Sequence, residues 1–144
     1  MNAPAPALDG RVGDLRRRFD AGFAAAPSLD APQVEDLLAL DEMNAGAHYL
    51  LAICREGLGD RQGALDHDQV ALYLDPGFAM PRLHLGLLAR RAGERETARR
   101  ELGQALVLFQ REDSSRVLLF GGGFSRESLV SLCRAELVAC GGAP

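Results

Sequence analysis

Three histidines, three cysteines and a run of three glycines are the residues of this 144-residue chain whose types could carry chemistry. His48, His67 and His84 could ligate zinc, but they belong to different predicted helices, and no His, Cys, Asp or Glu cluster has metal-ligand spacing. Cys133 and Cys140 fall on one face of a predicted helix, which favours small core residues over a redox pair. No motif typical of a nucleophilic site is present. These residues predict neither a metal site nor catalysis.

The glycine run, Gly121 to Gly123, comes just before a predicted helix. Backbone amides at such a position can cradle an anion at the helix N-terminus. The run lacks the spacing of phosphate-binding and dinucleotide-binding loops, and residues 116–120 before it predict only a weak strand. A plain chain reversal is therefore favoured, with phosphate or cofactor binding as the alternative.

The predicted helices that carry most of these residues show a sequence pattern that repeats every 34 residues. Leu51, Ala52, Gly59, Ala64, Ala71, Leu72 and Leu74 recur as Leu85, Gly86, Gly93, Ala98, Ala105, Leu106 and Leu108. This spacing is typical of a tetratricopeptide (TPR) repeat, a pair of helices that stacks on copies of itself. The small residues in the pattern indicate places where neighbouring helices approach closely.

The pattern predicts an all-α fold, a TPR-like array of helical hairpins (an α-solenoid) with about seven helices and a C-terminal capping helix. We expect a flexible linker over residues 1–8 and a single TPR domain over 9–141. The domain divides into a degenerate or capping hairpin at 9–44, repeats at 45–78 and 79–112, and an FGGGF turn with a capping helix at 113–141.

Capping residues locate the helices of the clear repeats. Asn44, Asp60 and Ser125 can cap helices that begin just after them. The pattern predicts helices over residues 45–58, 60–75, 79–92, 94–110 and 126–139. Phe120 and Phe124, on either side of the glycine run, are expected to fold back onto the repeats.

The first helices of stacked TPR units line a concave groove, which is the best candidate for a binding site. The predicted groove residues are Tyr49, Ile53, Glu56, Met80, Leu83, Leu87, Arg90 and Arg91. Apolar side chains with two arginines at one end could hold a peptide that carries a carboxylate. The alternative is that the C-terminal segment of the chain covers these apolar residues.

Composition narrows the class of protein. With 47% hydrophobic and 25% charged residues, the chain is typical of a globular protein, and its net charge of −4 argues against nucleic-acid binding. No apolar run reaches the roughly 20 residues of a membrane span, and the beginning of the sequence does not resemble a signal peptide. The cysteines include no C-x-x-C pair, so we expect reduced thiols in the cytoplasm. We expect either a small free-standing protein or a fragment of a longer one.

Several segments resemble the TPR tails of some chemoreceptor glutamate methyltransferases, the CheR family. They are HYLLA at 48–52, YLDPGFA at 73–79, HLGLLARR at 84–91, LLFGGGFSRESL at 118–129 and LCRAEL at 132–137. The resemblance extends over residues 36–141, and the FGGGFSRESL block is its most specific part. The chain departs from the general TPR pattern at Arg55 and at Gln110, which leaves the number of complete repeats open.

The resemblance implies a non-catalytic tail. Family members with such a tail carry, upstream, a Rossmann-like S-adenosylmethionine domain that methylates receptor glutamates, and none of its motifs occurs here. It therefore implies no catalytic residue and no cofactor in this chain. The implied partners are a chemoreceptor cytoplasmic domain, the enzyme's own catalytic domain or another chemosensory protein, near receptor arrays in the cytoplasm. We expect a monomer or a weak homodimer.

Two other functions remain open. The chain could be a free-standing TPR scaffold or dimerisation module with no link to a methyltransferase. It could also bind S-adenosylmethionine itself, through the glycine run.

Overall fold

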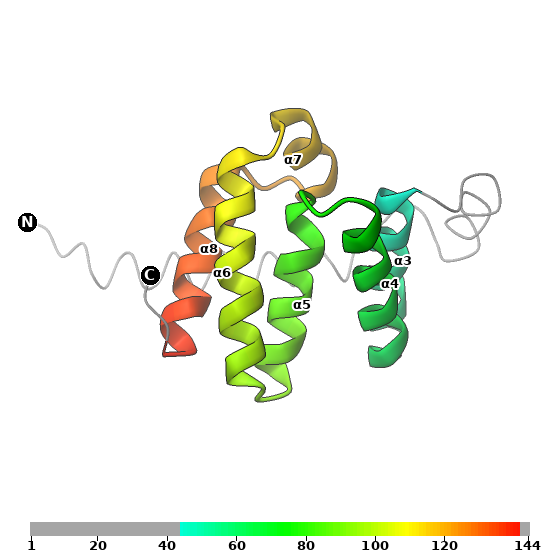
Figure 1. The fold of residues 1–144 in the computed structure, drawn as a ribbon, viewed down its shortest axis with the longest axis horizontal. Helices are drawn as coiled ribbons and strands as arrows, with labels where there is room; N and C mark the ends of the chain where they lie inside the picture. The colour runs from blue at the N-terminus through cyan, green and yellow to red at the C-terminus, as the bar shows by residue number, and fades with distance from the viewer. Residues whose placement is uncertain (1–43, 142–144) are drawn as a thin grey trace, which may run out of the picture.

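The computed structural model describes residues 44–141, and this part of the chain is all-helical, as predicted (Figure 1). The predicted linker at 1–8 and the predicted hairpin at 9–44 lie outside the described residues, apart from Asn44. The helices are α3 (Ala45–Gly57), α4 (Arg61–Leu74), α5 (Ala79–Arg91), α6 (Arg95–Arg111), α7 (Ser114–Phe120) and α8 (Arg126–Ala139). Over the same range, no helix is long and apolar enough to cross a membrane.

The predicted helix starts are confirmed by side-chain caps. The Asn44 side chain accepts a hydrogen bond from the Ala47 amide at 2.9 Å, and the Asp60 carboxylate accepts one from the Gly63 amide at 2.9 Å. Ser125 Oγ accepts from the amide of Ser128 at 3.1 Å. Each cap satisfies an amide that has no partner within its helix.

Between α6 and α8 the structure differs from the prediction. The sequence suggested a weak strand over residues 116–120, but the chain forms the short helix α7 there, capped by Asp113. Val117 is buried, while Leu118 and Leu119 are exposed. The apolar run therefore belongs to a helix with one buried side, so the described residues contain six helices where the sequence predicted five.

Equivalent glycines make the turns inside the two hairpins α3–α4 and α5–α6. Gly59 and Gly93, which are one period apart, have φ values of 81° and 77°. A Cβ atom would meet no other atom at either position, so the backbone conformation and not lack of space selects glycine. The same turn chemistry thus ends the first helix of each hairpin.

Small residues let the paired helices pack closely. The alanines at positions 52, 64, 71, 98 and 105 are completely buried. A Cβ atom on Gly86 of α5 would lie 2.7 Å from Cγ of Leu102 and 3.3 Å from its backbone nitrogen, on α6. The predicted close approach is therefore confirmed for these alanines and for Gly86, but it is wrong for Gly59 and Gly93, where backbone conformation selects glycine.

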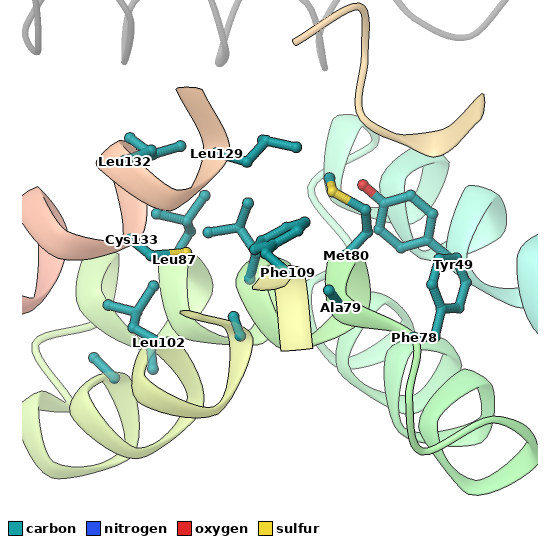
Figure 2. Close-up of a cluster of buried hydrophobic side chains, with 14 of the residues drawn as sticks. Tyr49, Phe78, Ala79, Met80, Leu87, Leu102, Phe109, Leu129, Leu132 and Cys133 are labelled. Carbon is teal, nitrogen blue, oxygen red and sulfur yellow. The ribbon is translucent and has the colours of Figure 1, made fainter. Parts of the chain in front are cut away.

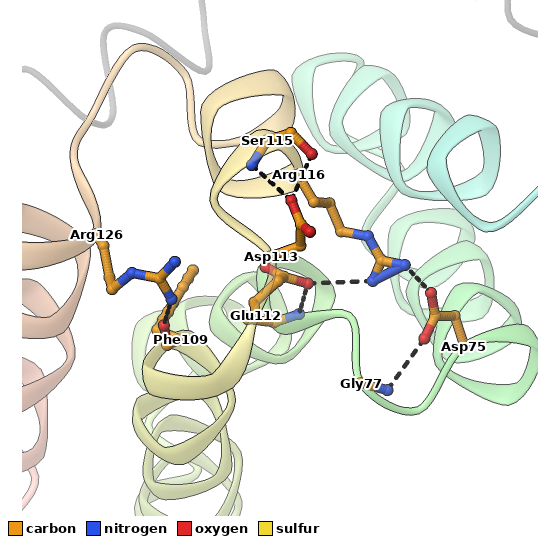
Figure 3. Close-up of polar contacts among 9 residues, drawn as sticks. Asp75, Gly77, Phe109, Glu112, Asp113, Ser115, Arg116 and Arg126 are labelled. Carbon is orange, nitrogen blue, oxygen red and sulfur yellow. Dashed lines mark hydrogen bonds and ion pairs between the residues drawn. The ribbon is translucent and has the colours of Figure 1, made fainter.

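A polar junction joins the two hairpins to α7 (Figure 3). Glu112, just after α6, accepts a hydrogen bond at 3.1 Å from the amide of Ala79, the first residue of α5. The N-cap residue of α5 itself provides no side-chain hydrogen bond. Arg116 pairs with Glu112 at 3.2 Å and with Asp75, and its guanidinium lies 4.7 Å from the centre of the Phe78 ring. The end of α6 thus caps the beginning of α5, and α7 is tied to both.

The contact at Gly86 yields a stability prediction. Gly86→Ala forces Leu102 out of its position, so we expect the free energy of unfolding to fall by about 1–3 kcal/mol. Gly103→Ala, on α6, is the matched control, because its Cβ meets nothing within 4 Å. Removing that helical glycine should stabilise the chain by about 0.5–1 kcal/mol. Urea unfolding followed by circular dichroism measures both changes, and equal effects would contradict the close approach.

Candidate functional site

The apolar residues of the predicted groove lie on α3 and α5, and all of them are buried. No side chain in this set, which we call the inner face, is more than 5% exposed: Tyr49, Ile53, Met80, Leu83 and Leu87. They belong to one hydrophobic cluster with residues of α6 and α8. In Figure 2, Leu129, Leu132 and Cys133 of α8 lie over this cluster, beside Leu87 and Phe109. The structure therefore favours the alternative in which the C-terminal segment covers the groove.

Phe120, at the end of α7, covers the other end of the inner face. Its ring lies 6.2 Å from that of Tyr49 and 5.0 Å from that of Phe78, both in edge-on geometry. A Cβ atom on Gly46 of α3 would lie 2.5 Å from the Phe120 ring. The absence of a side chain at Gly46 therefore makes room for Phe120, which folds back onto the repeats as predicted.

Arg90 binds a carboxylate, as the groove prediction required, but the carboxylate belongs to the chain itself. Arg90 Nε lies 2.5 Å from Glu136 Oε1, and the Glu136 side chain is fully buried. Glu136 stands on α8 among Leu132, Cys133 and Leu137. The apolar side of α8, with its buried acid, thus supplies the chemistry predicted for an acidic peptide.

Glu56 and Arg91, the other charged residues of the predicted groove, enter a chain of ion pairs with His84 and Asp68. His84 Nδ1 lies 2.5 Å from Asp68 Oδ2, and Nε2 lies 2.7 Å from Glu56 Oε1. Glu56 in turn pairs with Arg91. Asp68 and His84 are essentially inaccessible to solvent. The network joins α3, α4 and α5.

The pKa values indicate alternating charges in this network. Burial disfavours a charged imidazole, but Asp68 and Glu56 outweigh it and raise the pKa of His84 to about 9. Burial raises the pKa of Asp68 to about 6, although His84 opposes the shift. Burial also opposes ionisation of Glu56, but His84 and Arg91 bring its pKa below the usual value. At neutral pH both nitrogens of a charged His84 donate to carboxylates, so the ring has no lone pair for a base or a metal ligand.

Asp68 and Glu136 are the two site residues that the sequence reasoning missed. Asp68 lies on the buried side of α4 between Ala64 and Ala71, at the repeat position that Leu102 occupies in α6. Glu136 stands in the same way on the apolar side of α8. A carboxylate at an apolar position of a periodic pattern is the signal that could have identified both, because such a charge needs a partner inside the protein.

The remaining candidate residues form no metal or redox centre within residues 44–141. His48 and His67 bring their Nδ1 atoms to 3.2 Å, but no group of three or more His, Cys, Asp or Glu side chains in that range could hold a metal ion. Burial lowers the pKa of His67, and His48 adds to the effect. Cys133 and Cys140 are buried, as predicted, and burial raises the pKa of Cys133 to about 12, which makes its thiol unreactive.

The glycine run forms the predicted chain reversal. A Cβ atom on Gly121 would lie 2.4 Å from the Val117 carbonyl oxygen, while Gly122 and Gly123 have φ values of 65° and 84°. Each glycine therefore has a local conformational or steric reason. Arg126 donates to the carbonyl of Phe109 and, at 3.0 Å, to Ser114 Oγ, so it fixes the first residue of α8 near the end of α6 (Figure 3).

A scan against models of known protein families gives no match for this sequence, and a search of curated proteins gives none either.

The network predicts a pH-dependent contribution of His84 to stability. Its pKa is raised from 6.5 to about 9, so its contribution is complete below pH 6.5 and is lost as the pH rises through 9. We expect the difference in unfolding free energy between the wild type and His84→Gln to shrink over this range, by up to about 1.4 kcal/mol per pH unit. Urea unfolding at pH 6.5, 7.5, 8.5 and 9.5 measures it. His67→Gln is the control and should show a constant difference from pH 7.5 upward, because the pKa of His67 is lowered and the ring is neutral there in both the folded and the unfolded chain. A constant difference for His84→Gln as well would refute the charged network.

The Arg90–Glu136 pair predicts how strongly α8 is held. Arg90→Ala removes the guanidinium from a buried carboxylate, which should cost about 3–5 kcal/mol of unfolding free energy. The double variant Arg90→Leu/Glu136→Leu removes both charges and should recover most of this loss. Arg134→Ala, an exposed position on the same helix, is the control. If Arg90→Ala has the same free energy of unfolding as the wild type, the ion pair does not hold α8 in place.

Proposed function

We propose that this chain is a TPR-like protein-interaction module, and that it serves as a regulatory or targeting tail of an S-adenosylmethionine-dependent chemoreceptor glutamate methyltransferase in a bacterial chemosensory pathway. The observation that carries the TPR assignment is that positions one period apart have the same structural role in two consecutive hairpins. Gly59 and Gly93 make the same left-handed turn, and Ala64 and Ala98 are both fully buried. A stack of helical pairs is an architecture used mainly to bind other proteins.

The link to chemoreceptor methylation rests on the resemblance of residues 118–129 and of the repeats before them. The geometry of this block supports treating the repeats and the terminal helix as one unit. Phe120 packs on Tyr49 and Phe78 of the first hairpin and its junction, and α8 packs on α6. A tail of this kind would place the module in the cytoplasm near receptor arrays, with a receptor, the catalytic domain or another chemosensory protein as its partner.

A binding role also agrees with the fact that the side chains capable of acid–base chemistry are paired with one another. His84, Asp68 and Glu56 are engaged with one another, and His84 and Asp68 are inaccessible to solvent. We therefore assign S-adenosylmethionine to the separate catalytic domain that the resemblance implies, and we assign no cofactor to this chain.

One observation favours a second candidate function, a dimerisation module. Leu118 and Leu119 of α7 are adjacent and are 77% and 74% exposed, and such an apolar pair is suited to a contact between two copies of the chain. Sedimentation equilibrium distinguishes the two candidates, because a dimer that Leu118→Ser/Leu119→Ser converts to a monomer would support the second one.

The proposed function predicts direct binding to a chemosensory partner. We expect isothermal titration calorimetry to detect binding of the chain to a chemoreceptor cytoplasmic rod or to the methyltransferase domain, with a Kd on the order of micromolar. Gly86→Leu, which disrupts packing between α5 and α6, should abolish binding, whereas Gly57→Ala, at a helical glycine with open space at Cβ, should retain it. If the wild-type chain binds neither protein at millimolar concentration, the proposed partners are wrong.

A further inference from the structure

A second groove lies on the side of α5 that faces α4 and α6, away from the inner face. It consists of two cavities of about 450 and 530 Å3 that share Pro76 and Arg82 in their walls and therefore adjoin. Tyr73 of α4 stands in one wall, Leu85 of α5 contributes to the same cavity, and Val107 of α6 lines the other cavity. We call this feature the outer groove. Figure 1 shows α4 and α6 on either side of α5.

The outer groove keeps large apolar side chains accessible. Tyr73 is 85% exposed and Val107 is 44% exposed. The inner face, by contrast, is buried, with Phe120 against Tyr49 and residues of α8 in the same apolar cluster. Among residues 44–141, the outer groove is thus a hollow surface that combines accessible apolar groups with space for a side chain of another molecule.

The accessible charges in the outer groove are positive. Arg82 and Arg100 line it with side chains that are 27% and 59% exposed, and the one acid in its walls, Glu101, is only 10% exposed. Glu101 lies 2.7 Å from Arg82 and 3.6 Å from Arg100, so one carboxylate is shared between two guanidinium groups. One positive charge is therefore not balanced within the groove, and an incoming carboxylate could pair with Arg100.

Gly103 lines the larger cavity and contributes no side chain to its wall. A glycine inside a helix costs about 1 kcal/mol relative to alanine. Neither packing nor backbone conformation accounts for it here, because a Cβ atom would meet nothing within 4 Å and φ is not positive. The missing side chain keeps the cavity open between Arg100 and Val107.

We propose that the outer groove binds an acidic amphipathic helix of a partner protein, which inserts apolar side chains beside Tyr73 and Val107 and places a carboxylate on Arg100. Helical walls on both sides and apolar side chains along the hollow suit the helix-in-groove mode of recognition, and the unbalanced positive charge selects an acidic ligand. The proposal rests on the proposed function only in taking the chain as a protein-interaction module, and it does not depend on which protein is the partner.

The test uses a synthetic 16-residue helical peptide with leucines on one face and glutamates on the other, labelled with fluorescein. Anisotropy titration should show that it binds the wild-type chain at least about tenfold more tightly than the version with lysines in place of the glutamates, and than the version with serines in place of the leucines. In 1H–15N spectra the acidic peptide should shift the amide signals of Tyr73, Gly103 and Val107.

Matched variants locate the binding. Gly103→Glu fills the cavity and adds a negative charge, and should weaken binding at least about tenfold, while Gly57→Glu, another helical glycine with open space at Cβ, should not change it. Arg100→Glu should weaken binding in the same way, and Arg111→Glu, an exposed arginine on the same helix outside the groove, should not. Circular dichroism checks that all variants are folded.

Several outcomes would overturn the proposal: no binding at millimolar peptide, equal binding of the lysine version, or unchanged binding by Gly103→Glu. A chain that dimerises by itself, and that Gly103→Glu makes monomeric, would assign the groove to a second copy instead. If the peptide binds in the groove but the chemosensory proteins do not bind the chain, the proposed function is wrong and the groove proposal is retained. If those proteins bind the Gly103→Glu variant with the same affinity as the wild type, the groove proposal is wrong and the proposed function is retained.

Discussion

The contacts of the Glu112 carboxylate with α5 and with Arg116 are the interaction on which the arrangement of the described helices depends. It caps the first amide of α5 and pairs with Arg116, which in turn reaches Asp75 after α4. One small junction therefore connects both hairpins and α7, and it brings Phe120 to the end of the inner face. A free helix N-terminus leaves amides without partners, and Oε2 of Glu112 accepts both from the Ala79 amide and from Arg116, so it supplies that partner and ties α7 to α5.

The filling of the inner face changes where a partner is expected to bind. Concave grooves in helical arrays usually receive an external segment, but here α8 supplies both the apolar surface and the acid that the groove chemistry calls for. Glu136 on Arg90 and Leu132 near Leu87 reproduce the contacts predicted for a bound peptide. The outer groove, on the opposite side of α5, also offers accessible apolar and basic groups, so a partner could bind there while the inner face stays closed.

We expect the buried pairs of this chain to contribute more to the specificity of packing than to net stability. Removing a charge from water costs several kcal/mol, which a good ion pair only roughly offsets. A wrong packing of α3, α4 and α5 would leave Asp68 or His84 buried without its partner, and that would cost far more. The network therefore raises the free energy of alternative registers of the hairpins. Alanine-rich helices that pack through small residues would otherwise allow such registers.

Five of the six described helices, with their turns, could be predicted from the sequence. The caps at Asn44, Asp60 and Ser125 and the left-handed glycines depend on interactions within a few residues, so local patterns identify them. The 34-residue period is visible because equivalent positions of the two hairpins carry the same residue types. The α7 helix was missed because seven residues are too few to form a stable helix without tertiary contacts. Folding of the whole chain was needed to bring α8 into one apolar cluster with the inner face, to pair Arg90 with Glu136, and to let Glu112 cap α5 from 33 residues away. These contacts join distant parts of the chain, and only folding determines which of several possible partners a buried charge meets.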